Sequence, residues 1–247
     1  MNGYNQSPFA NITPVVKNLL IINIILFIGV NTMELVNINL YKWLGGYYFN
    51  APNFHLWSFI SYMFLHADYH QPAHIIFNMF ALFSFGPILE QTLGSKKFFN
   101  FYFICGIGAM LCQMLVQAYE VHAITGGFTL SNVSADPQDF SAFAPYGMLG
   151  VKLYSIYNVP IVGASGAIFG LLVGFGMLYP NLEMMVLFIP VPVKAKYIIP
   201  AYIVFELYMG LNPMEGDSVA HYAHLGGALV GFLMIKIWRL QRPNNFY

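Results

Sequence analysis

The long apolar runs of this chain limit its possible folds more than any other feature. The first run, from Val15 to Val30, is nearly continuous. With its flanks it reaches the roughly 20 residues that a helix needs to cross a ~30 Å hydrocarbon core. Only 8% of the residues are charged and 58% are hydrophobic, whereas about 25% of an average soluble domain is charged. The chain is therefore predicted to be an all-α polytopic membrane protein.

The apolar runs predict a six-helix bundle, with a membrane domain over residues 15–239. Clusters of glycine, proline and polar residues mark the connections between the runs. Interfacial helices are expected at 57–65 and within 119–162. The predicted spans are 15–30, 72–90, 98–118, 165–179, 194–211 and 219–238. The remaining segments are a short N-terminal segment 1–14, a long outer loop 31–71, an outer loop 119–162, a short outer loop 212–218 and a tail 240–247.

The distribution of basic residues supports six spans. Of the ten lysines and arginines, eight lie on the side that holds both termini, and only Lys42 and Lys152 lie opposite. This asymmetry obeys the positive-inside rule, which places both termini in the cytoplasm. A seventh span within 140–162 would move Lys194 and Lys196 to the outer side and break the rule. The segment 119–162 is therefore predicted to be an outer loop.

A serine among small residues opens the fourth predicted span, as Gly163-Ala164-Ser165-Gly166. In the six-span topology Ser165 lies toward the outer face, at a depth similar to that of His224 in the sixth span and His74 in the second. Polar groups at such depth are expensive, so each is a functional hypothesis. The alternative is that the small residues serve only close packing and the histidines merely bridge helices.

Glycines on two of the spans favour the functional reading. Gly166, Gly170 and Gly174 recur every four residues in the fourth span, and Gly227 and Gly231 do so in the sixth. Residues at this spacing share one helix face, and small faces let two backbones approach closely. Such an approach would bring the Ser165 hydroxyl within the roughly 2.6–3.2 Å that a serine and its histidine base require.

A tetrahedral intermediate also needs hydrogen-bond donors for its oxyanion. His74 and Asn78 are four residues apart on the second span and share a face. Together with the Ser165 N–H at the positive end of its helix, they are candidates for an oxyanion hole. The nearest acidic residues in the loop before His224 are Glu215 and Asp217, one to two turns away. The sequence therefore favours a Ser165–His224 dyad over a triad.

These motifs resemble the rhomboid family of intramembrane serine proteases. The similarity covers roughly residues 55–235 and rests on Gly163-x-Ser165-Gly166, Ala223-His224-x-x-Gly227-x-x-x-Gly231, His74-x-x-x-Asn78 and Glu90 with Leu93-Gly94-Ser95. It implies that Ser165 is the nucleophile, His224 the base, and His74 and Asn78 the oxyanion stabilisers. It also implies a six-helix core, a cavity open to the outer face with the 212–218 loop as its lid, and single-span or other membrane proteins as substrates.

Two positions depart from the family pattern. Many rhomboids have Trp-Arg in the first outer loop, whereas Trp57 is followed here by Ser58. Phe169 stands where a tyrosine often packs against the catalytic histidine, so the ring is expected without its hydroxyl. Neither departure removes a chemical group from the predicted site.

Other functions are less favoured by the sequence. A noncatalytic membrane-protein binder on the same scaffold stays open as the alternative. A transporter would be expected to show matched halves with broken helices, and no internal repeat is visible. His66, His70 and His74 recur every four residues, but Pro72 interrupts them and no HExxH accompanies them, so neither a metal nor another cofactor is predicted.

Charge and targeting signals suggest the surroundings of the protein. The formal net charge is zero, which gives no electrostatic case for nucleic acid as a partner. The N-terminus lacks the basic residues of a signal peptide, and the first apolar run is too long for a cleaved segment. The lipid bilayer is the expected surrounding, and the bacterial inner membrane is the predicted location.

Overall fold

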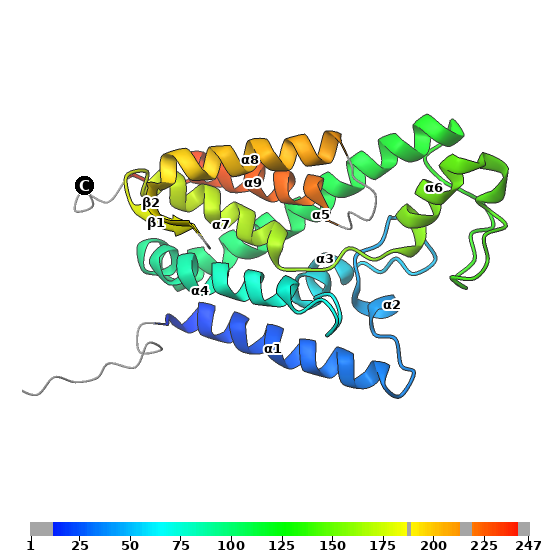
Figure 1. Cartoon of the computed structure of the whole chain (residues 1–247), viewed down its shortest axis with the longest axis horizontal. Helices are drawn as coiled ribbons and strands as arrows, with labels where there is room; N and C mark the ends of the chain where they lie inside the picture. Colours follow the sequence, from blue (N-terminus) through cyan, green and yellow to red (C-terminus); the bar gives the residue numbers. More distant parts are fainter. Residues whose placement is uncertain (1–11, 187–188, 213–218, 242–247) are drawn as a thin grey trace, which may run out of the picture.

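The computed structural model describes residues 12–186, 189–212 and 219–241, and these form a mostly helical bundle (Figure 1). Each predicted span corresponds to one long helix. The elements are α1 (Pro14–Glu34), α2 (Tyr41–Leu44), α3 (Ser58–Ser61), η1 (Tyr62–Phe64), α4 (Ala73–Leu93), α5 (Ser95–Thr125), η2 (Ala144–Tyr146), α6 (Met148–Asn158), α7 (Ser165–Leu178), β1 (Glu183–Val186), β2 (Ile189–Lys194), α8 (Ala195–Leu211) and α9 (His221–Ile237).

Helices α5, α7 and α9 form the centre of the bundle, and each packs against the other two. Helix α4 packs on α7, α1 packs on α4, and α8 lies along α9 and α7. Helix α7 is buried along most of its length because its neighbours cover it on every side. The core between these helices is made of large apolar side chains, among them Leu82, Leu89, Phe98, Phe101, Tyr102, Leu171 and Phe175.

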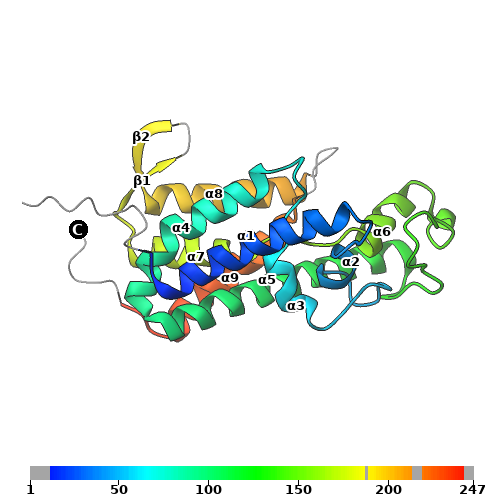
Figure 2. The ribbon, with the colours of Figure 1, turned by 90° about the horizontal axis from the view of Figure 1, so that it is seen from below.

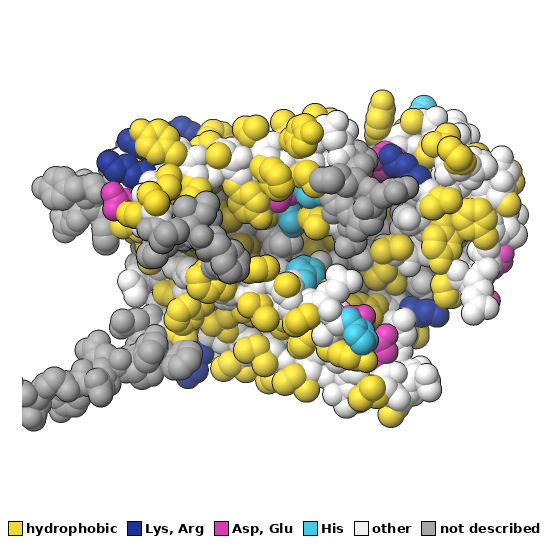
Figure 3. Space-filling view, viewed as in Figure 1, with side chains coloured by type: hydrophobic (Ala, Val, Ile, Leu, Met, Phe, Trp, Pro, Cys, Tyr) yellow, Lys and Arg dark blue, Asp and Glu magenta, His cyan; other side chains and the backbone are white. Residues whose placement is uncertain are grey.

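The outer surface of the bundle is apolar, as expected of a protein in contact with lipid. Figure 3 shows hydrophobic side chains over most of the visible face, with charged groups mainly toward its ends. Helices α1, α4 and α5 are each long and apolar enough to cross a membrane, whereas α7, α8 and α9 have 14, 17 and 17 residues. The chain is therefore an integral membrane protein, and the count of six spans stays a prediction.

Helix α5 is longer than the predicted span 98–118. It has 31 residues and ends where Gly126, with φ of 77°, adopts the left-handed conformation that glycine favours and donates its N–H to His122 O. The added turns reach beyond the bundle and form a second core with α6, which lies within the segment 119–162. That α6 is interfacial stays a prediction. This core contains Tyr47, Tyr48, Ala51, Val121, Phe143, Leu153, Ile156 and Tyr157.

The connection before α8 contains an antiparallel two-stranded sheet, which the all-α prediction did not include. Strands β1 and β2 pair Glu183 with Lys194 and Met184 with Val193. Figure 2 shows the pair projecting from one end of the bundle. Each strand has a free edge, which explains why Pro190 and Pro192, without an N–H to donate, are tolerated in β2.

Glu90, near the end of α4, fastens the start of α1. Its buried carboxylate accepts hydrogen bonds from the N–H groups of Val15 and Val16 at 3.1 and 3.0 Å and from Ser95 Oγ at 2.6 Å. The first N–H groups of a helix have no intrahelical partner, so the carboxylate satisfies donors that would otherwise be unpaired. This contact fixes α1 against α4 at the end of α7 opposite Ser165.

Candidate active site

Ser165 and His224 lie in contact at one end of the central helices. Ser165 is the first residue of α7, and its Oγ lies 2.8 Å from Nε2 of His224, in the first turns of α9. His224 is buried, and Ser165 is partly exposed. The distance falls within the range at which a histidine can accept the proton of a serine hydroxyl.

Glycines set this distance, because α7 and α9 touch through their backbones. A Cβ added at Gly227 would overlap Gly166 O, and one added at Gly231 would lie 2.7 Å from Gly170 Cα. No side-chain rotation could relieve either clash, since the opposing atoms belong to the backbone. The glycines of α9 therefore lie directly on the backbone of α7 and leave no room for a methyl group, whereas a Cβ at Gly166 or Gly170 would meet Ala109 or Cys105 of α5.

Gly163 shapes the entry to α7. Its φ of 125° lies in a region that side chains rarely adopt. A Cβ at this position would lie 2.8 Å from His74 Nε2 and 3.5 Å from Ser165 Oγ. Glycine thus keeps open a small space that borders both the hydroxyl and the imidazole of His74.

His74 presents a donor to this space. The N–H of Ala67 donates to its Nδ1 at 3.2 Å, so the neutral ring carries its proton on Nε2. Asn78, one turn further along α4, is buried and donates from Nδ2 to His74 O at 2.8 Å, and its second Nδ2 hydrogen stays available. The Ser165 N–H has no intrahelical partner because it opens α7. His74, Asn78 and Ser165, which carry these three donors, line the same cavity.

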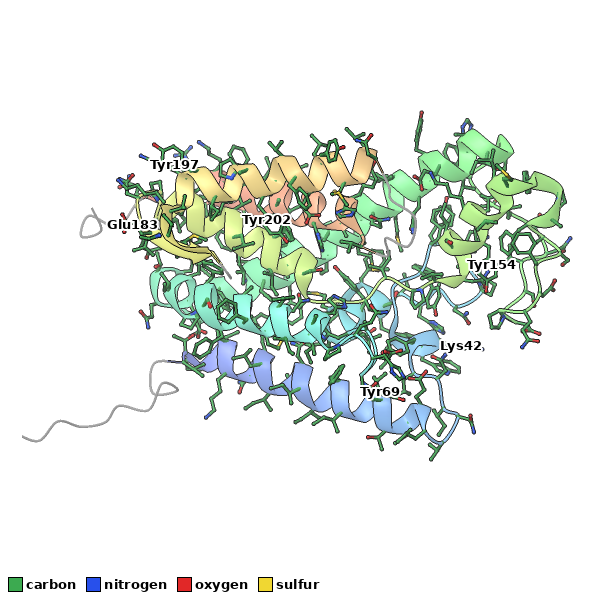
Figure 4. All side chains as sticks on the ribbon, in the orientation of Figure 1. Lys42, Tyr69, Tyr154, Glu183, Tyr197 and Tyr202 are labelled. Atoms are coloured by element: carbon green, nitrogen blue, oxygen red, sulfur yellow. The ribbon has the colours of Figure 1, made fainter. Side chains whose placement is uncertain are left out.

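Phe169 supports the imidazole of His224. The two rings stack at 4.3 Å with an interplanar angle of 11°. Phe169 also contacts the ring of Tyr202 of α8, at 5.0 Å between ring centroids, and Figure 4 shows Tyr202 on the inner side of α8. The resemblance implied an aromatic ring against the histidine, and a ring without a hydroxyl occupies that place.

The site opens into a cavity of about 760 Å³ between α4, α7, α8 and α9. Its size is that of a typical ligand pocket. In Figure 3 histidine side chains are visible near the middle of the face, between the two halves of the bundle. The walls are mostly apolar, and the polar groups that line the cavity include Gln71, His74, Asn78, Ser165, Glu206, His221 and His224.

The expectation that no carboxylate lies behind His224 is wrong. Glu206 of α8 is 3% exposed, and its Oε2 lies 2.9 Å from His224 Nδ1 and 2.7 Å from His221 Nδ1. The carboxylate comes from the preceding helix, α8, and not from the loop before His224. An acidic residue inside an apolar helix was the signal that could have found it.

Glu206, His221 and His224 also have ligand atoms within 4.8 Å of one another, close enough to hold a metal ion. Each imidazole lies at hydrogen-bond distance from the carboxylate, which accounts for the grouping without an ion. This group of residues differs from His66, His70 and His74, the set whose spacing is visible in the sequence.

His66, from that second set, is neutral at physiological pH. Burial, and to a lesser extent the neighbouring His74, lowers the pKa of its ring to about 3.

Comparison with known proteins agrees with these features. A family model described as the Rhomboid domain matches residues 53–241. The chain is 28% identical over 196 residues to "Rhomboid protein 1, mitochondrial" of Saccharomyces cerevisiae, which covers 72% of this chain and 45% of that protein. It is 38% identical over 88 residues to "Rhomboid-like protease 3" of Toxoplasma gondii, 34% of this chain and 32% of that protein. The chain thus spans less than half the length of either relative. Since the family model matches most of its length, the chain belongs to the rhomboid family.

Proposed function

We propose that the protein is an intramembrane serine endopeptidase that cleaves the transmembrane segments of other membrane proteins. The observation that carries the proposal is the 2.8 Å contact between Ser165 Oγ and His224 Nε2 inside a cavity among membrane helices. Membership of the rhomboid family and the name of the Toxoplasma relative support the same activity.

In the proposed reaction Ser165 Oγ attacks the carbonyl carbon of the scissile bond, and its proton passes to His224 Nε2. The oxyanion accepts hydrogen bonds from His74 Nε2 and the Ser165 N–H, with Asn78 beside them. His224 then donates the proton to the leaving amine, and the C–N bond breaks. Water, deprotonated by the same imidazole, hydrolyses the acyl-enzyme and restores the serine.

The substrate must unwind before this attack, since a helical peptide bond is shielded by its own backbone. Glycine, proline or small residues around the cut would therefore favour cleavage. The proposed substrates are single-span or other membrane proteins that reach the cavity within the bilayer. The predicted lid 212–218 lies outside the described residues, apart from Asn212 at the end of α8.

In the proposed membrane arrangement six helices span the bilayer, and both termini lie in the cytoplasm. This arrangement obeys the positive-inside rule, because eight of the ten lysines and arginines lie on the side of the termini and two lie on the opposite side. The bacterial inner membrane also stays a prediction, because both relatives come from eukaryotes and one is named mitochondrial.

A serine-reactive fluorophosphonate tests the proposed function directly. We expect the probe to label the purified wild-type protein in detergent or lipid, and Ser165→Ala to abolish the label. In proteoliposomes, the wild type should cleave members of a panel of tagged single-span proteins and Ser165→Ala none. A folded wild-type protein that neither labels nor cleaves would support the noncatalytic membrane-protein binder instead.

A further inference from the structure

We propose that Glu206 is the positioning carboxylate of His224, so that the site works as a Ser165–His224–Glu206 triad. This inference rests on the proposed function and deepens it, because the motifs alone predict a dyad. Glu206 would touch neither substrate nor reacting atoms and would act only through the imidazole.

The geometry assigns the protons of the histidine. An ionised carboxylate can only accept hydrogen bonds, so the 2.9 Å contact with Glu206 Oε2 places a proton on Nδ1 of His224. The neutral ring then has its lone pair on Nε2, the nitrogen that faces Ser165 Oγ at 2.8 Å. This is the tautomer that a general base needs. When Nε2 takes the serine proton, the carboxylate also stabilises the imidazolium.

The placement of Glu206 is costly unless the residue has such a task. Its neighbours Val204 and Phe205 are 66% and 53% exposed, whereas Glu206 is 3% exposed. Acidic groups within membrane helices are costly and are usually retained where they serve a function. Two imidazole N–H donors compensate this carboxylate, and both come from α9.

Two further contacts hold the carboxylate in place. His221 Nδ1 lies 2.7 Å from the same Oε2 that His224 contacts, so the oxygen is fixed from two sides. One turn beyond Glu206 on α8, Gly210 O accepts a hydrogen bond from Tyr222 Oη at 2.7 Å. These contacts fasten α8 to the first turn of α9 beside the site, so the acid is held by rigid elements rather than by a loop.

The rate of fluorophosphonate labelling at Ser165 tests the triad. The probe is small and needs no unwinding of a substrate helix, so its rate reports the activation of the serine. In soluble Ser-His-Asp proteases, replacing the aspartate by asparagine lowers kcat about 10⁴-fold. We expect Glu206→Gln to slow labelling at least about 100-fold, and Glu206→Asp, which keeps the charge on a shorter side chain, to give an intermediate rate.

Glu120→Gln is the matched control. Glu120 lies on α5, far from the cavity, and forms a partly exposed ion pair with Lys152 at 2.8 Å. Such pairs contribute little to stability, so we expect this variant to label at the wild-type rate. Labelling of Glu206→Gln within about threefold of the wild type would overturn the inference, as would a Glu206→Asp rate no higher than that of Glu206→Gln.

A second measurement keeps the inference testable if the Glu206 variants fail to fold. In wild-type protein with ¹⁵N-labelled histidine, the nitrogen chemical shifts report which ring nitrogen is protonated. We expect His224, assigned by comparison with His224→Asn, to carry its proton on Nδ1. A proton on Nε2 in the resting enzyme would overturn the inference. Absence of labelling in the wild type would instead count against the proposed function, while the tautomer still reports the carboxylate contact.

Discussion

Helix α9 makes two contacts of opposite character on either side of His224. Toward α7 the contact is dry and made of backbone, with Gly227 against Gly166 and Gly231 against Gly170. Toward α8 it is polar, with His221 and His224 on the carboxylate of Glu206. We refer to these as the glycine contact and the carboxylate contact. The first fixes how far apart the serine and the imidazole lie, and the second fixes how the imidazole is oriented and protonated.

This difference indicates that the glycine contact contributes mainly to stability and the carboxylate contact mainly to catalysis. Close backbone packing is what holds membrane helices together, since lipid gives apolar side chains no reason to associate. A buried charge contributes little to stability and is retained where it serves a function. Changes at the glycine contact should therefore unfold the protein. Changes at the carboxylate contact should leave it folded but lower the reaction rate at Ser165.

The largest effect is expected at the glycine contact. The Cβ added by Gly227→Ala would overlap Gly166 O, so α7 and α9 must separate. Overpacking of this kind costs about 3 kcal/mol, at the upper end of the usual range. Thermal denaturation in mild detergent measures this loss of stability, and fluorophosphonate labelling should disappear with it.

Gly29→Ala is the matched control for this variant, because a Cβ at Gly29 of α1 would meet no atom within 4 Å. We expect equal or slightly higher stability there, as alanine favours the helix. Equal stability of Gly227→Ala and Gly29→Ala would show that the two helices do not rely on close contact.

The second largest effect is expected from Glu206→Gln, which should lower labelling while leaving stability nearly unchanged, unlike a change at the glycine contact. Glu206→Gln keeps the shape of the side chain and can still accept a hydrogen bond, so we expect it to lose only about 1 kcal/mol of unfolding free energy. Labelling should nevertheless fall as described above. The same denaturation assay measures the stability, and a loss as large as that of Gly227→Ala would mean that the carboxylate mainly holds the fold.

A smaller effect is expected at Phe169, which lies between the two contacts, with its ring on His224 and beside Tyr202. Phe169→Leu keeps an apolar side chain but removes the stacked ring. Aromatic pairs contribute about 0.5–1.5 kcal/mol beyond buried area, so labelling should slow about 2- to 10-fold. An unchanged labelling rate in a folded variant would show that the stack does not orient the imidazole.

The smallest effect is expected from Tyr222→Phe, which removes the hydrogen bond to Gly210 O and nothing else. We expect a loss of about 1 kcal/mol in unfolding free energy and labelling within about twofold of the wild type. A large fall in labelling would show that the position of α8 depends on this bond and would tie the carboxylate contact more closely to the fold.

Much of the fold can be predicted from the sequence, because apolar runs determine where membrane helices form. Each predicted span corresponds to one helix, but the ends differ where local polar residues continue a helix, as in α5 beyond Ala118. The hairpin of β1 and β2 was not predicted, because Pro190 and Pro192 indicate only that a helix is interrupted and do not indicate that two strands pair.

The site was predictable only where motifs mark it. Ser165, His224, His74 and Asn78 stand at positions that the family pattern identifies, and the structure brings them to one cavity. Glu206 belongs to no motif, so its contact depends on how α8 and α9 pack. Depth offered a clue, since Glu206 lies five residues before the end of the predicted span 194–211 and His224 lies five residues after the start of the predicted span 219–238.

The carboxylate contact also bears on how the protein is made. Glu206 is synthesised 15 residues before His221, the nearer of its two partners. Until α9 follows, α8 would carry an uncompensated acid into the hydrocarbon. A hairpin of the two helices, delivered to the bilayer as a single unit, avoids this exposure, so biogenesis would favour joint over stepwise insertion of the last two helices.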